Sequence, residues 1–490
     1  MAYRNLRDFI ARLETAGELI RVQALVSAHL EITEIVDRIS KGPPDRNKAL
    51  LFERVKGYDI PVLINLFGSP RRMAWALGVE DLNELRDRMA ALIRPELPRG
   101  LGQMLDRAGE LWGALRAVGL GPKIMRNAPV QEVVLTGEQA TLDRFPILQC
   151  WPKDGGRYIT LPTVITRDPV SGVRNVGMYR LQVHDERTLG MHWQLHKGGA
   201  EHERKAIEAS ADRIPVAVSL GGDPAVIWAG SAPLPPDIDE FLLAGWLRGR
   251  PVELARCITQ PLEVPAEAEI VIEGYVNPDE RRPEGPFGDH TGYYTPVDEY
   301  PVMHITAITH RREPVYPTTV VGRPPMEDYW MGKATERLFL PLMRLFLPEI
   351  VDIHMPPEGV FHNLVFVSIR KRFPGHPRKV INGLWGLGLM MLAKCIIVFD
   401  EHVDVQNTSE ALFYAFNNVD WARDVIIQEG PVDALDHASY QFAFGGKIGI
   451  DATAKSAQDG YLRQWPERIE MAEPIRKLVS ERWAEYGLAG

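Results

Sequence analysis

Cysteine is scarce in this chain: only three occur in 490 residues, and no two of them lie close together. A disulfide scaffold and a zinc site built from thiolates are therefore both excluded. Basic residues are also outnumbered, because 56 Lys and Arg stand against 65 Asp and Glu, a formal net charge of -9. Gripping a nucleic-acid backbone needs a basic surface, so nucleic acid is excluded as the main partner.

Long apolar runs are missing as well. The most apolar stretch covers residues 383–393, and at about 1.5 Å per residue it cannot cross a hydrocarbon core of about 30 Å. The first 14 residues carry charges throughout and lack the apolar segment of a secretory signal. Together with the few cysteines, these features predict a cytoplasmic protein that is at most peripheral on the inner face of the cell membrane.

Apolar and charged residues are both plentiful, at 45% and 25% of the chain, as in a soluble globular protein. At about 150 residues per domain, the length predicts about three domains. Helical spacing in the first part, short β-runs with turns in the middle and α/β alternation in the last part predict a mixed α/β (α+β) fold. We expect an α/β domain over 1–120, an antiparallel barrel or meander over 121–320, and an α/β domain with a terminal helix over 321–490.

A predicted hairpin in the middle of the chain carries the first candidate site. Alternation along its second strand, 189–195, continued to the next residue, places His192, Gln194 and His196 on one face, and Lys197 with two glycines follows. Imidazoles ligate metals, and glycines let backbone amides approach an anion, so this face could hold a metal and a phosphate. The alternative is a polar outer face of a barrel followed by a glycine turn, which the pattern alone favours.

The first strand of the same hairpin, predicted over 173–184, contains Asn175 and Arg180. Their separation of five residues would place them on opposite faces of a regular strand. A β-bulge at Gly177 would bring both side chains to the same side. A regular ladder through Gly177 would exclude a shared site.

A loop over 283–292 is the second candidate, because it places Glu284 and Asp289 among glycines and prolines that fix unusual backbone angles. A carboxylate paired with Arg180 would stay ionised, whereas one in a drier place could donate a proton. An acidic surface turn is an equally weighted alternative.

The third candidate, Glu240, lies at the start of a helix predicted over 238–248. The spacing of Asp237 and Glu240 favours an N-terminal capping box. A metal-ligand role would require the start of this helix to point at the hairpin.

Several stretches of the chain together resemble the UbiD family of decarboxylases, which use prenylated FMN. The resemblance covers essentially the whole chain, and its motifs occur in the order of the family. They are LEITEI at 30–35, CWP at 150–152, NVGMYR at 175–180, WQLHKGG at 193–199, EGPFGDHTGYY at 284–294, GRPP at 322–325, PEIVD at 348–352 and GIDAT at 449–453.

The resemblance implies a split β-barrel as the middle domain, which binds prenylated FMN together with a divalent metal, Mn²⁺, and K⁺ as a candidate second ion. The metal ligands implied are Asn175, His196 and Glu240. The implied cofactor contacts are Met178, Tyr179, Arg180, His192, Trp193, Gln194, Lys197 and Gly198. The implied catalytic network consists of Arg180, Glu284 and Asp289, with Asp289 as the proton donor.

The branch of the family that the chain resembles most implies loss of CO₂ from 4-hydroxy-3-polyprenylbenzoate to give 2-polyprenylphenol in ubiquinone synthesis. The sequence departs from enterobacterial ubiquinone enzymes at His192 and Lys197, where those enzymes carry Arg. A menaquinone precursor or a small phenolic or cinnamic-type acid is therefore the alternative substrate. A non-catalytic flavin- or metal-binding scaffold is a third reading, against which the acid loop and Arg180 argue.

The family also implies partners. They are a small aromatic acid as substrate, a flavin prenyltransferase that supplies the cofactor, and further copies of the chain in a dimer or hexamer formed through the C-terminal domain and its last helix. Because a prenylated substrate dissolves in membranes, peripheral membrane contact is an expectation, for which an amphipathic helix predicted within 101–118 is a candidate, although its pattern favours a helix packed within the domain.

Overall fold

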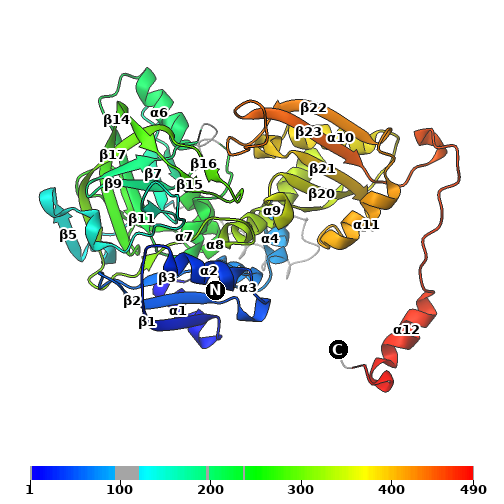
Figure 1. The fold of residues 1–490 in the computed structure, drawn as a ribbon, viewed down its shortest axis with the longest axis horizontal. Helices are drawn as coiled ribbons and strands as arrows, with labels where there is room; N and C mark the ends of the chain where they lie inside the picture. The colour runs from blue at the N-terminus through cyan, green and yellow to red at the C-terminus, as the bar shows by residue number, and fades with distance from the viewer. Residues whose placement is uncertain (1–2, 94–120, 195–197, 236–237, 489–490) are drawn as a thin grey trace, which may run out of the picture.

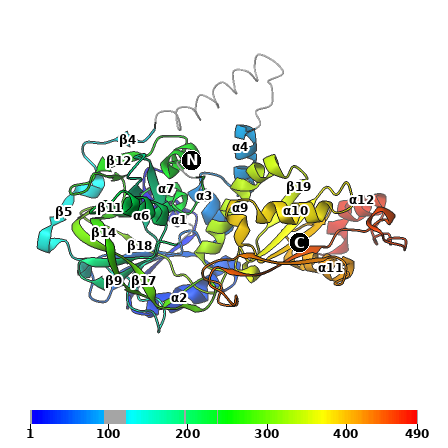
Figure 2. The same cartoon turned by 90° about the horizontal axis from the view of Figure 1, so that it is seen from above.

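The structure of the protein is a computed structural model that describes residues 3–93, 121–194, 198–235 and 238–488. The N-terminal and central elements lie together at one side, and the C-terminal sheet lies at the other (Figures 1 and 2). Between them runs the 20-residue helix α9 (Glu327–Phe346). The helix predicted within 101–118 and the boundary predicted near residue 120 fall outside the described residues.

The N-terminal part is a four-stranded mixed sheet with helices, as predicted. Its strand order is β1-β2-β3-β18, so a strand from far along the chain completes the sheet. Helix α1 begins where the side chain of Asn5 accepts hydrogen bonds from two backbone amides, and its apolar face is buried. The elements are α1 Leu6–Thr15, α2 Glu31–Ser40, α3 Pro70–Ala76, α4 Asn83–Ile93, β1 Leu19–Val26, β2 Ala49–Val55, β3 Val62–Ile64 and β18 Tyr316–Pro317.

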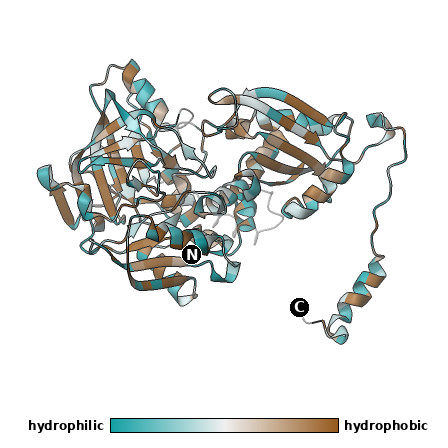
Figure 3. Ribbon diagram, viewed as in Figure 1, coloured by the Kyte–Doolittle hydropathy of each residue, from teal (hydrophilic) through white to brown (hydrophobic). Residues whose placement is uncertain are grey.

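The central part is built on a nine-stranded sheet in which every neighbouring pair is antiparallel. Its order is β6-β9-β10-β17-β14-β11-β7-β8, with β5 beside β17. The strands of this sheet carry many of the apolar residues in Figure 3. The strands of this part are β4 Lys123–Ile124, β5 Val133–Thr136, β6 Tyr158–Ile159, β7 Thr163–Arg167, β8 Arg174–Gly177, β9 Leu181–Asp185, β10 Thr188–Met191, β11 Ile214–Leu220, β12 Glu253–Arg256, β13 Glu263–Pro265, β14 Ile270–Glu284, β15 Phe287–Gly288, β16 Tyr294–Thr295 and β17 Asp298–His310, and the helices are α6 Gly198–Glu208, α7 Pro224–Ala229 and α8 Glu240–Arg248.

The strand predicted over 173–184 is two strands, β8 and β9, which lie in different places in the sheet. The bulge at Gly177 that would have brought Asn175 and Arg180 to the same side of one strand is therefore absent. Strand β8 ends at Gly177, and the next amide, that of Met178, donates instead to the carbonyl oxygen of Gly230 at 2.8 Å. Strand β10 likewise ends at Met191, so strand alternation does not govern the residues after it.

The C-terminal part is a five-stranded sheet of order β19-β20-β21-β23-β22 with helices on both faces. Alternate side chains of β20 and β21 contact α10 on one face and α11 on the other. Helix α10 ends at Trp385, and a short 3₁₀ turn follows. The elements are β19 Ile350–His354, β20 Leu364–Ile369, β21 Cys395–Asp400, β22 Val425–Pro431, β23 Phe444–Asp451, α10 His376–Trp385, α11 Thr408–Asn418 and α12 Glu473–Glu481.

The predicted terminal helix, α12, stands away from the rest of the chain at the end of an extended segment (Figure 1), and none of its residues is buried. Within the described ranges, no helix combines the length and apolar character needed to span a bilayer. The mixed α/β fold class predicted from the sequence is confirmed.

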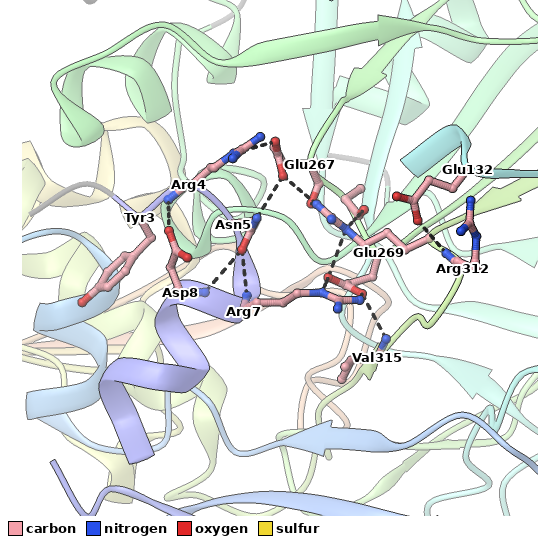
Figure 4. Close-up of polar contacts among 12 residues, drawn as sticks. Tyr3, Arg4, Asn5, Arg7, Asp8, Glu132, Glu267, Glu269, Arg312 and Val315 are labelled. Atoms are coloured by element: carbon pink, nitrogen blue, oxygen red, sulfur yellow. Dashed lines mark hydrogen bonds and ion pairs between the residues drawn. The ribbon is translucent and has the colours of Figure 1, made fainter. Parts of the chain in front are cut away.

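Ion pairs fix the N-terminal segment to the central part (Figure 4). Glu267 accepts hydrogen bonds from Arg4 Nε at 3.1 Å and from Asn5 Nδ2 at 3.0 Å. Glu269 accepts two from Arg7, at 3.3 and 3.2 Å. The residues that begin α1 are therefore held by carboxylates that precede β14.

Replacing Glu269 with Gln removes the negative charge that Arg7 and Arg311 share. We expect the free energy of unfolding to fall by about 2 kcal/mol, less than for a fully buried pair because Arg7 is half-exposed. Thermal unfolding followed by circular dichroism measures this. The exposed Glu138 supplies the control, Glu138→Gln, for which we expect a change within about 0.5 kcal/mol.

Candidate active site

Arg180 joins two carboxylates in the interior of the central part. Its Nε and Nη2 donate to the two oxygens of Glu284 at 2.9 and 3.0 Å, and its Nη1 donates to Asp289 Oδ2 at 2.6 Å. All three side chains are less than 10% exposed. The two predicted candidates, the hairpin and the acid loop, thus meet at one guanidinium.

The chain reaches this arrangement through a bent loop. Strand β14 ends at Glu284, and Gly285 follows in the left-handed region, at φ +106°, where a Cβ would lie 3.0 Å from the carbonyl oxygen of Pro296. The loop then returns as the hairpin β15–β16, which places the ring of Phe287 4.5 Å from the guanidinium carbon of Arg180. The glycine and the returning hairpin therefore aim both acids at Arg180.

His192 extends the network on the side of Glu284. Burial and the nearby Arg180 charge lower the pKa of His192, so the neutral ring donates from Nδ1 to Glu284 Oε2 at 3.2 Å. Burial alone would raise the pKa of Glu284, but the hydrogen bonds from His192 and Arg180 outweigh it and lower that pKa to about 2. Glu284 is therefore an ionised anchor.

Asp289 is ionised as well. Burial opposes its charge, yet the neighbouring His290 and Arg180 hold the pKa of Asp289 well below its usual range. The sequence suggested that one carboxyl group pairs with Arg180 while the other stays protonated in a drier place. The structure differs, because Arg180 forms hydrogen bonds with both Glu284 and Asp289. Asp289 Oδ1 also contacts His290 Nδ1 at 2.7 Å, a partner that the sequence reasoning did not single out.

Glu240 points at strand β8, as a metal-ligand role requires. Its Oε2 accepts a hydrogen bond from the amide of Val176 at 2.7 Å, and burial raises the pKa of Glu240 to about 7. The predicted capping box is wrong: α8 begins at Glu240, and Asp239 is the N-cap residue that accepts from the amide of Phe241. Asp237 falls outside the described residues.

Asn175 is brought to the segment that follows the second predicted strand. A Cβ on Gly198 would lie 2.0 Å from Asn175 Oδ1, so any larger residue there would displace the Asn175 side chain. Tyr179 links the same two segments, because its hydroxyl accepts from the amide of Gly199 at 3.0 Å and from Asn175 Nδ2 at 3.4 Å. Of the predicted metal ligands, Asn175 therefore lies against Gly198 at the start of α6, and Glu240 binds the amide of the next residue of β8, Val176.

The structure describes no side-chain hydrogen bond for three more of the predicted site residues. Trp193 is 5% exposed, and its Nε1 has no hydrogen-bond partner among the described residues. His196 and Lys197 fall outside the described ranges, immediately before Gly198. In the part of the chain that the structure describes, no cluster of three or more His, Cys, Asp and Glu could hold a metal.

Three family models match the chain, and together they cover most of it. They describe the N-terminal, the Rift-related and the C-terminal domains of 3-octaprenyl-4-hydroxybenzoate carboxy-lyase and match residues 10–92, 123–324 and 329–452. The chain belongs to the UbiD family of carboxy-lyases, which are decarboxylases. An uncharacterized protein of Aquifex aeolicus is 52% identical over 487 residues, 99% of both chains.

Solved structures of UbiD-class enzymes share the fold over the full length. The enzyme HmfF from Pelotomaculum thermopropionicum, in complex with FMN, is 31% identical with a TM-score of 0.80, covering 98% of this chain and 100% of that one. An evolved dimeric form of HmfF, in complex with prenylated FMN (prFMN), is 30% identical with a TM-score of 0.79, covering 99% and 100%. Vanillic acid decarboxylase of Sedimentibacter hydroxybenzoicus is 26% identical, with a TM-score of 0.86 in its closed form, covering 100% of both chains, and 0.79 in its open form, covering 99% of both.

The raised pKa of His290 is testable by titration. The Asp289 carboxylate raises the pKa of His290 to about 9, and burial opposes it. In Asp289→Asn burial prevails, so we expect the pKa of His290 to fall below its ordinary value of about 6.5. Histidine NMR over pH 5–10 measures both proteins, and an unchanged titration would contradict the assignment.

The same shift predicts the pH dependence of stability. Because folding raises the pKa of His290, its contribution is complete below pH about 6.5 and is lost as the pH rises through about 9. In Asp289→Asn the free energy of unfolding should not show this decrease between pH 7 and 9. Thermal unfolding of both proteins across this pH range measures the difference.

Proposed function

We propose that this chain removes CO₂ from an aromatic or unsaturated carboxylic acid with the help of prenylated FMN and a divalent metal. One observation carries the proposal: Arg180 clamps two buried carboxylates, and the strand before it brings Asn175 to the glycine segment at Gly198 and the amide of Val176 to Glu240. The network of acids suits proton transfer, and the glycine segment suits a phosphate. Membership in the UbiD family supports both readings.

The residues present suit such a cofactor. A side chain at position 198 would displace Asn175, and Trp193 Nε1 is a buried donor without a described partner. We assign cofactor contacts to the residues that the family resemblance implies, Met178, Tyr179, Arg180, His192, Trp193, Gln194, Lys197 and Gly198. When bound, the prenylated flavin supplies an electrophilic centre that accepts the electron pair left by departing CO₂.

The metal assignment rests on donor chemistry. An amide oxygen, an imidazole and a carboxylate from Asn175, His196 and Glu240 suit a divalent ion such as Mn²⁺. Glu240 is a buried carboxylate without a described cation partner, so a bound cation would offset the cost of its charge. The metal would hold the cofactor phosphate; K⁺ as a second ion stays a prediction.

The chain's own residues handle the proton. The bond between the substrate carbon and its carboxylate breaks, CO₂ leaves, and the carbon must receive a proton in its place. Asp289 delivers that proton, and Arg180 with Glu284 holds Asp289 in position. His192 and Phe287 shield the network from water, which strengthens each charged contact.

The first substrate to test is a 4-hydroxy-3-polyprenylbenzoate, as in ubiquinone synthesis. A small phenolic acid or a menaquinone precursor is the second candidate, because His192 and Lys197 replace Arg and because vanillic acid decarboxylase shares the fold at a TM-score of 0.86. We further propose a flavin prenyltransferase as cofactor supplier and a homo-oligomer that covers the exposed helix α12.

The C-terminal sheet takes part in the site in its closed arrangement. The higher TM-score against the closed than against the open vanillic acid decarboxylase, 0.86 against 0.79, supports this inference. Phe361, from the turn before β20, lies 5.4 Å from the ring of His290.

The deciding assay uses anaerobically purified protein, co-expressed with a flavin prenyltransferase and supplied with Mn²⁺. We expect CO₂ release from at least one acid in a panel of prenylated 4-hydroxybenzoate, a menaquinone precursor, and phenolic and cinnamic acids. The panel identifies the substrate. No release by protein shown to carry prenylated FMN would contradict the proposed function.

Two variants test the roles of the network. We expect Asp289→Asn and Arg180→Ala to lower kcat by at least about 100-fold, because proton transfer by a positioned group contributes about 10²–10⁴-fold. Circular dichroism checks that both variants stay folded. Wild-type turnover by either would show that the roles are assigned wrongly.

Glu240→Gln tests the metal independently of turnover. Gln keeps the shape and the acceptor for Val176 but loses the charge, so we expect Mn²⁺ to bind at least about tenfold more weakly, about 1.4 kcal/mol. Calorimetric titration of the flavin-loaded protein measures this, and Glu138→Gln is the exposed control. Equal Mn²⁺ affinity would remove Glu240 from the ligand set.

A further inference from the structure

The proposed function, on which this inference rests, requires a supply of protons to Asp289. Each turnover consumes one proton, because a C–H bond replaces the bond to the carboxylate. Asp289 is only 5% exposed, and its contacts with Arg180 and His290 keep it ionised. Asp289 therefore stores no proton of its own between turnovers, and a neighbouring group must hold one.

His290 is placed to hold that proton. Its Nδ1 donates to Asp289 Oδ1 at 2.7 Å, and its Nε2 donates to His362 Nε2 at 3.0 Å. Both nitrogens of His290 thus face acceptors, which is the hydrogen-bond pattern of a doubly protonated imidazolium. In this pair the neutral ring of His362 accepts, at its Nε2, the hydrogen bond that His290 Nε2 donates.

The surrounding charges favour this division. Asp289, Asp328 and Asp433 face His290 and raise its pKa to about 9 despite burial. Burial and the positive His290 lower the pKa of His362 to about 4, although Asp433, Asp289 and Asp436 oppose that shift. At neutral pH, His290 therefore carries the proton and His362 accepts its second N–H.

His362 comes from the C-terminal part, in the turn before β20. The two residues before it, Val360 and Phe361, adopt left-handed backbone conformations at φ +55° and +45°, which non-glycine residues rarely do. Phe361 packs between the ring of His290 and helix α9, where a Cβ on Gly332 would lie 3.3 Å from the Phe361 ring. The strained turn therefore holds His362 against His290.

We propose that His290 is the proton reservoir of Asp289 and that His362 is a positioning residue that completes this reservoir when the C-terminal part contacts the acid loop. As the substrate carbon takes a proton, the N–H bond at His290 Nδ1 breaks, Asp289 carries the proton, and a C–H bond forms. Asp289 ends as a carboxylate and His290 as a neutral imidazole. A proton from the bulk solvent, relayed by water in the emptied site, binds His290 Nδ1 and restores the starting state, so each cycle takes up one solvent proton.

Replacement of His362 by Leu removes the acceptor for His290 Nε2. We expect kcat of the holoenzyme to fall at least about fivefold, with KM nearly unchanged. The alkaline limb of the pH profile of kcat should move from near pH 9 to a value at least one pH unit lower. His362→Gln keeps an acceptor and should restore most of both. The buried His376 of α10 supplies the control, His376→Gln, for which we expect a wild-type pH profile.

A second variant keeps the test sharp if His362→Leu does not fold. His290→Gln can donate to Asp289 but cannot release a proton, so we expect kcat to fall at least about tenfold and the limb near pH 9 to disappear. An unchanged kcat and pH profile in His290→Gln, or in folded His362→Leu, would overturn the proposal.

A readout without turnover separates this inference from the proposed function. Histidine NMR of the chain without cofactor should show His290 titrating at least one pH unit lower in His362→Leu than in wild type, and near its wild-type value in His362→Gln. An unmoved His290 titration in His362→Leu would overturn the positioning role even in an active enzyme. Shifted titration in a protein that releases no CO₂ from any acid would instead refute only the decarboxylase.

Discussion

The guanidinium of Arg180 is the contact on which the site depends, because it satisfies two buried carboxylates at once. Each carboxylate alone would carry a large desolvation cost, and two of them side by side would repel each other. One fixed, planar cation with donors on two edges removes both problems. Glu284 occupies one edge of that cation as a permanent partner, which leaves Asp289 bound through a single oxygen and its other oxygen facing His290.

The sequence predicted the fold class and most elements well, because the apolar periodicity of helices such as α1 and strands such as β11 and β20 is strong and local. It failed where tertiary contacts cut an apparently continuous strand. No local sequence pattern indicates that the chain leaves the sheet at Met178, whose amide donates to the carbonyl oxygen of Gly230. The starting point of α8 was also misjudged, since Asp239 and Asp237 are both good N-cap residues.

The candidate site was predictable only where its residues share a motif. Glu284 and Asp289 stand in one loop, where charge alone suggested one partner for Arg180, and the family resemblance implied that both acids join it. His290 stands in the same loop, but its role appears only through the ring that faces it. His362 lies 72 residues away in a turn without any chemical signature, and only the fold brings it within 3.0 Å.

The return of the chain to its first sheet has a consequence for synthesis on the ribosome. Strand β18 pairs with β3, and Glu327 accepts hydrogen bonds from the amides of Asn65 and Phe67 at 3.0 and 2.8 Å. The N-terminal sheet therefore cannot reach its final hydrogen bonding until nearly two-thirds of the chain has left the exit tunnel. Until then, the edge of β3 stays open, and a nascent chain in this state is a natural client for chaperones.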